Sequence, residues 1–388
     1  MARLAKMPEI ADHLHACTMC GHCVPVCPAY REHRWETAAP RGKVFLMRQY
    51  EDRGPLDWIL RRDVTPDDYF ARAVFECTAC GACENVCMAD IPFDTMWQSV
   101  KGWMVASGKG MPEHLPLFEN VRRTYNIYGE PQEARAAWMP PEAVPSDAPD
   151  VVYWVGCAAS YRHQQIARAV VKILNAAKVK YRILGADEWC SGGPLLNMGF
   201  GEYVKKVLMP HNIRAVAKTG AKALVTACAE DYRAFQRDYR RYGGNPPFRI
   251  LHITQYIEQL VKDKRLTFTK PLPNLKIAFH DACQLGRVCQ IYDAPRTAMK
   301  YLRGLTVLEM YHAKDETICS GAAAGYPQAF PEQAKNIASE RIEEALATGG
   351  TMIGTTCPFA EDHLAEVARQ RNTGVSVIDI VELAAQAL

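Results

Sequence analysis

The hydrophobic and polar positions along the chain change their period near residue 150. Before that point apolar residues recur at helical intervals, which predicts helices in the first part of the chain. One predicted helix opens at Thr65-Pro66, because proline is well suited to a first helical position, and places Phe70, Ala73 and Val74 on one side. The predicted helical segments are 9–16, 40–53, 64–76, 95–107 and 115–129.

After residue 150, short apolar runs alternate with helical segments, a pattern typical of α/β folds with parallel sheets. Strands are predicted over 150–157, 179–185, 223–228, 275–283, 305–310 and 351–357. Helices are predicted over 162–178, 203–220, 230–243, 294–304 and 331–349. Residues 129–150 are rich in Pro and Ala and lack any period, which predicts a linker or a strap laid over a neighbouring surface.

Composition narrows the class of protein. The 388 residues carry 46 basic and 43 acidic side chains, a net charge of only +3, which leaves no basic footprint for nucleic acid. There is no apolar run long enough to span a bilayer, and the N-terminal stretch is too short and polar for a secretory signal. We therefore expect a reducing compartment, the cytoplasm, where the fifteen cysteines favour metal binding over disulfides.

Eight of the cysteines form two runs of the spacing C-x2-C-x2-C-x3-C, the second displaced from the first by 60 residues. Such runs hold 4Fe-4S clusters, and in two-cluster ferredoxins the fourth cysteine of each run binds the other cluster. The spacing predicts one cluster on Cys17, Cys20, Cys23 and Cys87. It predicts the second on Cys77, Cys80, Cys83 and Cys27.

Disulfides and zinc are the alternatives for these cysteines. A chain of this length buries its own core without bridges, and zinc sites usually consist of two separated CxxC pairs. Pro28 follows the first run, whereas Met88 stands where the second run would usually have proline. Proline at this position shapes the turn and binds no metal, so the cluster prediction is unchanged.

The first region resembles the helical ferredoxin module of succinate dehydrogenase iron-sulfur subunits. The resemblance implies a helical di-cluster ferredoxin domain over residues 1–128, followed by the linker 129–150. Arg41 and Lys43 lie in this region; a solvated helix face is favoured for them over a position facing a cluster or partner.

Six further cysteines repeat in two halves. The intervals are 33 and 38 residues for Cys157, Cys190 and Cys228, and 36 and 38 residues for Cys283, Cys319 and Cys357. The middle cysteine of each half precedes Ser-Gly, and the outer two follow predicted strands. An internal duplication explains the repeat, and strand carboxyl ends in open parallel sheets are where sites lie, so each set of three thiols is predicted to converge on one crevice.

The two halves resemble the paired cysteine-rich CCG domains of a family of redox subunits. Its members include the D and B subunits of heterodisulfide reductase, the glycolate oxidase iron-sulfur subunit and the C subunit of anaerobic glycerol-3-phosphate dehydrogenase. CGHCVPVCPAY, PRGK, VGCAAS, HDACQLGR, YDAPR and TTCPF carry the resemblance. It implies a multidomain α+β chain in which the helical ferredoxin domain precedes two duplicated α/β, Rossmann-like CCG domains, 151–270 and 271–388.

Each CCG-like half departs from the family pattern of five cysteines by the same two positions. Ser191 and Ser320 replace the second cysteine of the doublet, and Asp231 and Ala360 replace the last cysteine. Three thiols cannot hold the family's noncubane, disulfide-cleaving cluster in the same way. They could hold a cubane whose last ligand in the first half is an oxygen from Asp231 or Ser191. In the second half the candidate ligand is Ser320 or Cys289.

Plainer roles compete with metal binding at several positions. The six cysteines could be buried apolar residues left from a degenerate site, although their retention at matched positions favours a further iron-sulfur site or sites. For Cys289 the buried role is favoured. His280 and Asp281 could deliver a proton, but for the strand-end His280 a structural hydrogen bond is favoured. No dinucleotide fingerprint is found, and GAAAG at 321–325 is no phosphate loop, so no flavin or NAD is expected in this chain.

Three functions follow from these features. The first is an electron-transfer subunit of a multisubunit oxidoreductase, and the second is a catalytic heterodisulfide or disulfide reductase subunit. The third is a scaffold whose CCG-like halves only hold partners. The resemblance implies other redox subunits as partners: a flavoprotein such as a 2-hydroxyacid dehydrogenase, an acyl-CoA reductase, a heterodisulfide reductase-like subunit or a membrane cytochrome b. A membrane cytochrome b as partner would place the chain at the inner membrane, although the chain itself has no predicted membrane span. The catalytic residues of such a complex are not identified by this sequence.

Overall fold

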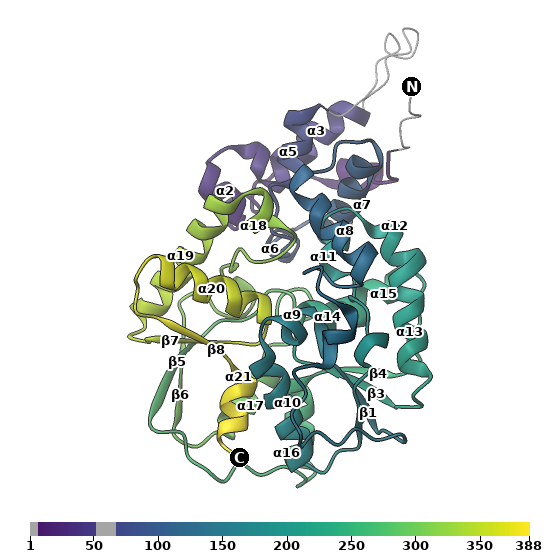
Figure 1. Ribbon diagram of the computed structural model, residues 1–388. Coiled ribbons are helices and arrows are strands. Elements are labelled where there is room, and N and C mark those ends of the chain that lie inside the picture. The colour runs from purple at the N-terminus through teal and green to yellow at the C-terminus, as the bar shows by residue number, and fades with distance from the viewer. Residues whose placement is uncertain (1–6, 52–66) are drawn as a thin grey trace.

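A computed structural model describes residues 7–51 and 67–388 (Figure 1). The predicted helix start at Thr65-Pro66 and the first residues of the N-terminal stretch lie outside the described residues. Within the described part, none of the helices is long and apolar enough to cross a bilayer.

Helices alone form the described part of the N-terminal region, which lies at one end of the molecule in Figure 1. Asp67 begins one of them by accepting a hydrogen bond from the amide of Phe70, the usual way to satisfy a free helix N-terminus. The α-helices are α1 (Ala11–Ala16), α2 (Pro28–His33), α3 (Pro40–Glu51), α5 (Asp68–Phe75), α6 (Ala82–Asn85), α7 (Phe93–Ala106) and α8 (Leu115–Thr124). Short 3-10 turns are η1 (Glu36–Ala38), η2 (Pro112–His114) and η3 (Gln132–Ala136).

The first α/β half contains a four-stranded parallel sheet in the order β2-β1-β3-β4. Its central strands are buried along their whole length, as expected for a parallel sheet covered on both faces. The strands are β1 (Val151–Trp154), β2 (Tyr181–Arg182), β3 (Ala223–Thr226) and β4 (Arg249–His252). The helical segments are α9 (Gly156–Tyr161), α10 (Gln164–Ala176), η4 (Gly185–Asp187), α11 (Gly193–Asn197), α12 (Gly201–Tyr203), η5 (Val204–Leu208), α13 (Met209–Ala217), α14 (Ala229–Arg233), η6 (Ala234–Asp238), α15 (Tyr239–Arg241) and α16 (Ile253–Lys262).

The second half repeats this topology, with a parallel sheet in the order β6-β5-β7-β8. Matching strand orders in the two halves agree with the duplication predicted from the cysteine spacing. The strands are β5 (Leu275–Phe279), β6 (Leu305–Glu309), β7 (Met352–Thr355) and β8 (Ser376–Asp379). The helical segments are α17 (Asp293–Lys300), η7 (Lys314–Glu316), α18 (Tyr326–Ala329), α19 (Pro331–Ala347), α20 (Pro358–Gln370) and α21 (Ile380–Gln386).

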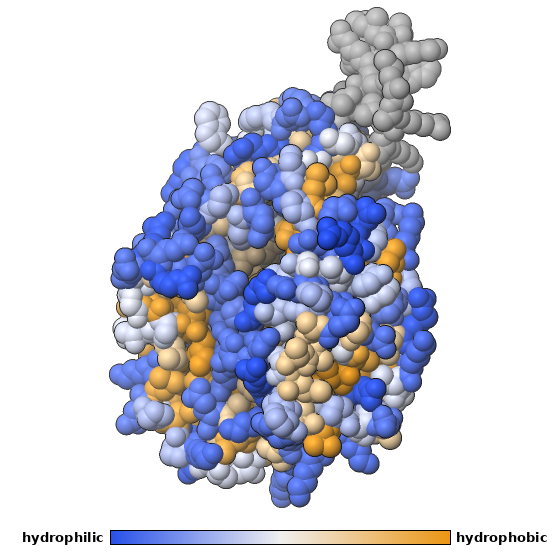
Figure 2. Space-filling model, viewed as in Figure 1, coloured by the Kyte–Doolittle hydropathy of each residue, from blue (hydrophilic) through white to orange (hydrophobic). Residues whose placement is uncertain are grey.

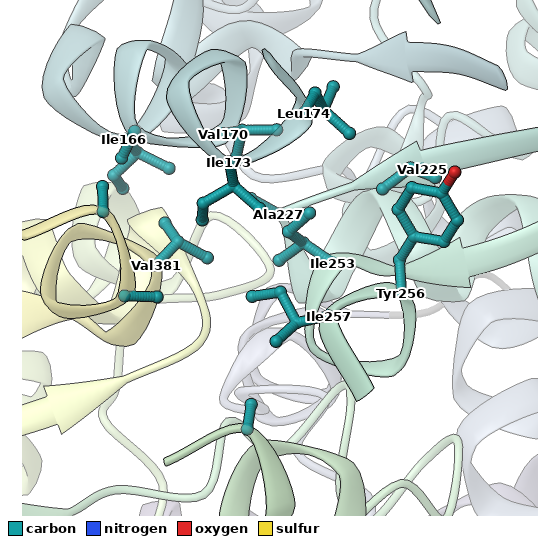
Figure 3. Close-up of a cluster of buried hydrophobic side chains, with 14 of the residues drawn as sticks. Ile166, Val170, Ile173, Leu174, Val225, Ala227, Ile253, Tyr256, Ile257 and Val381 are labelled. Carbon is teal, nitrogen blue, oxygen red and sulfur yellow. The ribbon is translucent and has the colours of Figure 1, made fainter. Parts of the chain in front are cut away.

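One hydrophobic core joins the two halves. Ile166 and Ile173 of α10 pack in the same buried cluster as Ile253 and Ile257 of α16 and Val381 of α21 (Figure 3). Helix α21, at the C-terminal end, lies against α10 of the first half, so the two halves are not separate bodies (Figure 1).

The N-terminal helices share a core with the second half. Trp97 and Met104 of α7 belong to one buried cluster with Tyr326, Phe330 and Ile337 of the second half. Helix α2 contacts α19. The N-terminal helices and the second half therefore share one buried core, which includes Cys80, Cys283 and Cys319.

The structure also describes residues 129–150, which cross the first half as a strap. Trp138 of this segment is fully buried in the core shared by the two halves. The Ser146 amide donates to the Tyr181 carbonyl oxygen, and the Gln132 side chain donates to the Glu188 carbonyl oxygen. The strap is thereby fixed across β2 and the loop that leads to Cys190.

Candidate functional site: clustered cysteines

The two cysteine runs share a left-handed backbone conformation at two equivalent positions. Met19 and Ala79 both take left-handed φ values, 60° and 52°, and Gly21 and Gly81 take 87° and 74°. A non-glycine residue in this region is uncommon and usually held there by its surroundings. Each loop is curled in the same way around its own thiols.

The first cavity lies near the surface of the N-terminal region. Its lining contains the four thiols predicted for the first cluster, Cys17, Cys20, Cys23 and Cys87. Cys20 is exposed to solvent, whereas Cys23 is buried. Arg41 also lines this cavity.

Two arginines of α3 fix the loop around the first cavity. Arg41 donates to the Met19 carbonyl oxygen and is ion-paired with Glu36. Arg48 donates to the carbonyl oxygens of Leu14 and Cys17, at 2.6 Å from each.

The second cavity is deeper, and its lining contains the four thiols predicted for the second cluster, Cys27, Cys77, Cys80 and Cys83. Burial is the main influence that raises the pKa of Cys27 to about 11, and the neighbouring thiols of Cys80 and Cys77 add to the rise. Four crowded thiols that oppose one another's ionisation fit a cationic iron centre, because it compensates their negative charge. The donor set and cradle in both cavities therefore fit an iron-sulfur cluster.

Lys43 and Lys101 also line the second cavity. The prediction of a solvated position is wrong for Lys43, which is 1% exposed. Its Nζ donates to the Glu76 carbonyl oxygen at 2.7 Å, and Lys101 Nζ donates to the Cys77 carbonyl oxygen at 3.3 Å. Burial lowers the pKa of Lys101, an effect that a Cys77 thiolate opposes. Arg41, by contrast, lines a cavity while remaining partly exposed.

The second α/β half holds the loop of the second cavity. Gln284 donates to the Ala79 carbonyl oxygen at 3.0 Å, and Arg287 donates to the Cys80 carbonyl oxygen at 2.9 Å. The Cys80 thiol lies beside that of Cys319, and the Cys319 thiol lies beside that of Cys283. The HDACQLGR segment thus connects the N-terminal cysteines to the second CCG-like half.

In the first half, Cys157 and Cys190 contact each other beside a buried arginine. Arg135 Nη2 lies 3.7 Å from the Cys157 sulfur and 2.8 Å from the Glu188 carboxylate. The hydrogen bond from Cys190 is the main influence that lowers the pKa of Cys157 to about 6, aided by Arg135 against the effect of burial. Asp231 lies near this pair, and burial raises its pKa to about 7 despite a hydrogen bond with Ser191.

The remaining two thiols meet between the halves. Cys228 and Cys357 are the N-caps of α14 and α20, equivalent helices of the repeat, and their thiols lie beside each other. The junction thus also brings thiols of the two halves into contact, and the convergence of each set of three on one crevice stays a prediction. Cys319, which contacts Cys283, also lies beside Cys80 of the N-terminal region.

The other predicted positions have structural partners. His280 accepts a hydrogen bond from Arg341 at 3.0 Å, and burial holds its pKa well below the usual range, so the predicted structural hydrogen bond is confirmed. Asp281 accepts two hydrogen bonds from Arg296. Burial raises the pKa of Cys289 to about 12. Ser320 and Ala360 are buried.

A crevice between the halves is lined by the loops that follow Cys190 and Cys319, and by α20 and α8. Pro194, Met198, Gly325, Asp362 and Leu117 are among its lining residues. Figure 2 shows a hollow on this face, with hydrophilic side chains over α19 beside it. Among residues 7–51 and 67–388, no three His, Cys, Asp or Glu side chains are arranged to hold a single metal ion.

Two domain families match the chain. Residues 13–91 match the 4Fe-4S dicluster domain, and residues 151–231 and 277–364 match the cysteine-rich domain. The first match spans both cysteine runs, and the second falls once on each α/β half.

Relatives match almost the whole chain. The D subunit of dihydromethanophenazine:CoB–CoM heterodisulfide reductase from Methanosarcina barkeri is 33% identical, over 97% of this chain and 94% of that protein. The EtfAB:quinone oxidoreductase of Syntrophomonas wolfei is 28% identical, over 95% of this chain and 57% of that protein. Among solved structures, a hypothetical protein from Helicobacter pylori has a TM-score of 0.53 at 10% identity, covering 89% of this chain and 67% of that one, a likeness of fold alone.

Proposed function

The chain belongs to the family of the heterodisulfide reductase D subunits, and from this membership we propose that it is the iron-sulfur electron-transfer subunit of a multisubunit oxidoreductase. The observation that carries the proposal is the pair of cavities lined by four cysteines each. Bound in them, iron-sulfur clusters would accept and donate one electron at a time.

Two 4Fe-4S clusters are assigned to these cavities. Cys17, Cys20, Cys23 and Cys87 hold the first, and Cys77, Cys80, Cys83 and Cys27 hold the second. The side chains around them position the ligands: Arg41 and Arg48 fix the first loop, and Gln284 and Arg287 fix the second. The exposure of Cys20 supports exchange with a partner at the first cavity, because electron transfer needs close approach.

The six remaining repeat cysteines are proposed to hold one or two further iron-sulfur clusters. Their burial and mutual contacts support this role, and Asp231 is the candidate oxygen ligand beside Cys157. The six are Cys157, Cys190, Cys228, Cys283, Cys319 and Cys357. The contact of Cys80 with Cys319 supports passage of electrons between the second cluster and these sites.

We propose that the chain divides into functional domains at the boundaries predicted from the sequence. A ferredoxin domain over 1–128 and a strap over 129–150 precede CCG-like domains over 151–270 and 271–388. The chain itself carries no flavin or NAD. Its partners are a flavoprotein, a heterodisulfide reductase-like subunit or a membrane cytochrome b, and they hold it in the cytoplasm or at the inner membrane.

Catalytic reduction of a disulfide is a second candidate function. The contact of Cys157 with Cys190 beside the guanidinium of Arg135 favours it, because a thiolate is the attacking species in thiol chemistry. The reaction would consume two electrons and two protons for each disulfide and release two thiols. Reduction of a small disulfide by the isolated, dithionite-reduced chain would favour this candidate over pure electron transfer.

Anaerobic iron and sulfide analysis with low-temperature EPR tests the main proposal. Two clusters give about eight irons per chain, and clusters in the CCG-like halves raise that number. A Cys157→Ala, Cys283→Ala double variant should lose the excess iron and one signal, whereas Cys289→Ala, at the unassigned cysteine, should lose neither. Fewer than about eight irons in the parent would contradict the proposal. So would an isolated, fully loaded chain that turns over a small substrate without any partner.

A further inference from the structure

Two lysines occupy equivalent places beside the second cavity. Lys43 lies on α3 and Lys101 on α7, and each is 1% exposed. Both side chains line the cavity that contains Cys27, Cys77, Cys80 and Cys83. Buried lysines are rare unless paired, so two at one cavity require an explanation.

The contacts of the lysines direct both charges at the cysteine run. Lys43 donates to the carbonyl oxygen of Glu76 and Lys101 to that of Cys77, so the two ammonium groups meet adjacent peptide groups at the start of the loop. Their Nζ atoms lie 5.9 Å from the ring centroid of Trp97 and 5.8 Å from that of Phe75. These contacts hold both groups in place without cancelling their charge.

No carboxylate in the described part of the chain lies within ion-pairing distance of either ammonium. The acidic residue that lines the same cavity, Asp94, accepts two hydrogen bonds from Arg233, at 2.9 and 2.7 Å. Its charge is therefore already matched by the guanidinium. The cavity retains two positive charges without a partner carboxylate.

The first cavity differs in this respect. Arg41, the cation in its lining, is ion-paired with Glu36, whose side chain is 53% exposed. Arg48 donates to the Cys17 carbonyl oxygen from outside this lining, and its side chain is only partly buried. A partner carboxylate and nearby water both weaken the field that Arg41 exerts on the four thiols. The two cavities have the same donors but different surrounding charge.

Reduction of an iron-sulfur cluster adds one negative charge, so nearby cations favour it. Burial opposes the added charge, but an interior charge pair also interacts more strongly than one in water. Two cations at hydrogen-bond distance from the loop oppose the cost that burial places on the added charge.

We propose that Lys43 and Lys101 raise the reduction potential of the cluster on Cys27, Cys77, Cys80 and Cys83 above that of the first cluster. The inference rests on the proposed function and deepens it, because it sets the direction of electron flow within the chain. Electrons that enter at the exposed first cavity collect at the second, where Cys80 contacts Cys319 of the second CCG-like half. The two lysines act on the cluster through their charge and do not bind its iron.

EPR-monitored redox titration of the full, cluster-loaded chain tests the inference. A Cys20→Ser variant identifies the signal of the first cluster, because Cys20 lines only the first of the two cavities. In the parent, the second cluster should have a higher midpoint potential than the first cluster. Lys43→Met and Lys101→Met should each lower that potential and leave the first cluster unchanged.

Three further variants control for structural damage. Lys43→Arg retains the charge and should retain the potential. Lys109→Met removes an exposed lysine that is ion-paired with Asp68 in the same region, and it should shift neither cluster. Arg41→Gln should lower only the first potential, by less than either lysine variant lowers the second.

Two results would overturn the inference. One is a parent in which the first cluster has the higher potential, a result that needs no variant and so does not depend on whether the variants fold. The other is a pair of methionine variants that bind both clusters with unchanged potentials. Failure of the proposed function is recognised separately, since a chain with fewer than about eight irons would lack two clusters to compare.

Discussion

The guanidinium of Arg135 lies 3.7 Å from the sulfur of Cys157, although the two residues belong to a Pro-rich strap and to the first α/β half. Arg135 is 2% exposed and is paired with Glu188, which is 1% exposed. Glu188 in turn accepts the amides of Val155 and Gly156, which precede Cys157. The strap therefore places a positive charge at the site and fixes the loop that presents the thiol.

Arg135→Gln should destabilise the protein by about 3–5 kcal/mol, because removal of one partner leaves the Glu188 carboxylate buried without its counter-charge. The free energy of unfolding from anaerobic urea titration measures this loss. Arg135→Gln combined with Glu188→Gln should recover part of it, since the second change removes the stranded charge.

Arg162→Gln provides the matched control, because Arg162 and Glu130 form an Arg–Glu pair in the same region that is 43% and 37% exposed. An exposed pair contributes about 0–1 kcal/mol, so this variant should be nearly neutral. Equal losses for Arg135→Gln and Arg162→Gln would show that the buried pair has no special structural role.

The sequence predicts most of the α/β fold because its central strands are continuous apolar runs. β1, β3, β5 and β7 lie within predicted strands. β4 and β8 are absent from the prediction, since each is a four-residue edge strand of mixed exposure that ends in a polar helix cap, His252 or Asp379. Neither has the continuous apolar run that marks a buried strand.

The charged residues around the cavities are harder to predict. Lys43 shares a helical stripe with Pro40, Val44 and Met47, and Lys101 shares one with Trp97 and Met104. This spacing places both lysines on the buried face, a signal available in the sequence but outweighed by the usual exposure of lysine. Arg135 has no such signal, because its segment has no period.

Asp94→Asn should cost about 3 kcal/mol, since it weakens a buried ion pair that joins α7 to α14. The Asp94 and Arg233 side chains are 2% and 0% exposed, and Arg233 retains a second carboxylate, Asp238, at 3.1 Å. Because Arg233 keeps this second partner, the expected loss of free energy of unfolding is at the lower end of the range for broken buried ion pairs. Urea unfolding measures it, and hydrogen exchange of residues 77–83 should rise as α7 loosens.

Glu119→Gln is the comparison for this variant, because Glu119 and Arg122 form an exposed pair on α8. It should change the free energy of unfolding by at most about 1 kcal/mol. If Asp94→Asn proved as harmless, the junction of α7 with the first half would depend on apolar packing and not on this ion pair.

His163 should make stability depend on pH. Burial alone would lower its pKa, but the neighbouring carboxylates of Asp362 and Glu361 on α20 outweigh that effect and raise the pKa to about 10. A histidine in the unfolded chain has a pKa of about 6.5. The stabilisation is therefore complete below the unfolded value and is lost as pH rises towards 10.

The parent and His163→Gln should differ most in free energy of unfolding at a pH of about 6, and the difference should shrink steadily at higher pH. Asp362→Asn should weaken the dependence, because it removes the partner that lies 3.1 Å from Nε2. A difference between parent and variant that is constant with pH would mean that the pKa of His163 is the same in the folded and unfolded protein.

Gly156 should tolerate no side chain, because of both its backbone and its neighbours. Its φ is +80°, and a Cβ atom there would lie 2.2 Å from Asp231 Oδ2 and 3.9 Å from the Cβ of Cys228. Gly156→Ala should therefore displace Asp231 and disturb the Cys157 loop.

Gly220→Ala isolates the backbone cost, since Gly220 has φ +72° and open space around it. The control should lose about 1–2 kcal/mol, and Gly156→Ala should lose more and also reduce the iron bound beyond the first two clusters. Equal stability losses with unchanged iron would mean that Asp231 moves freely and that close packing at Gly156 does not shape the site.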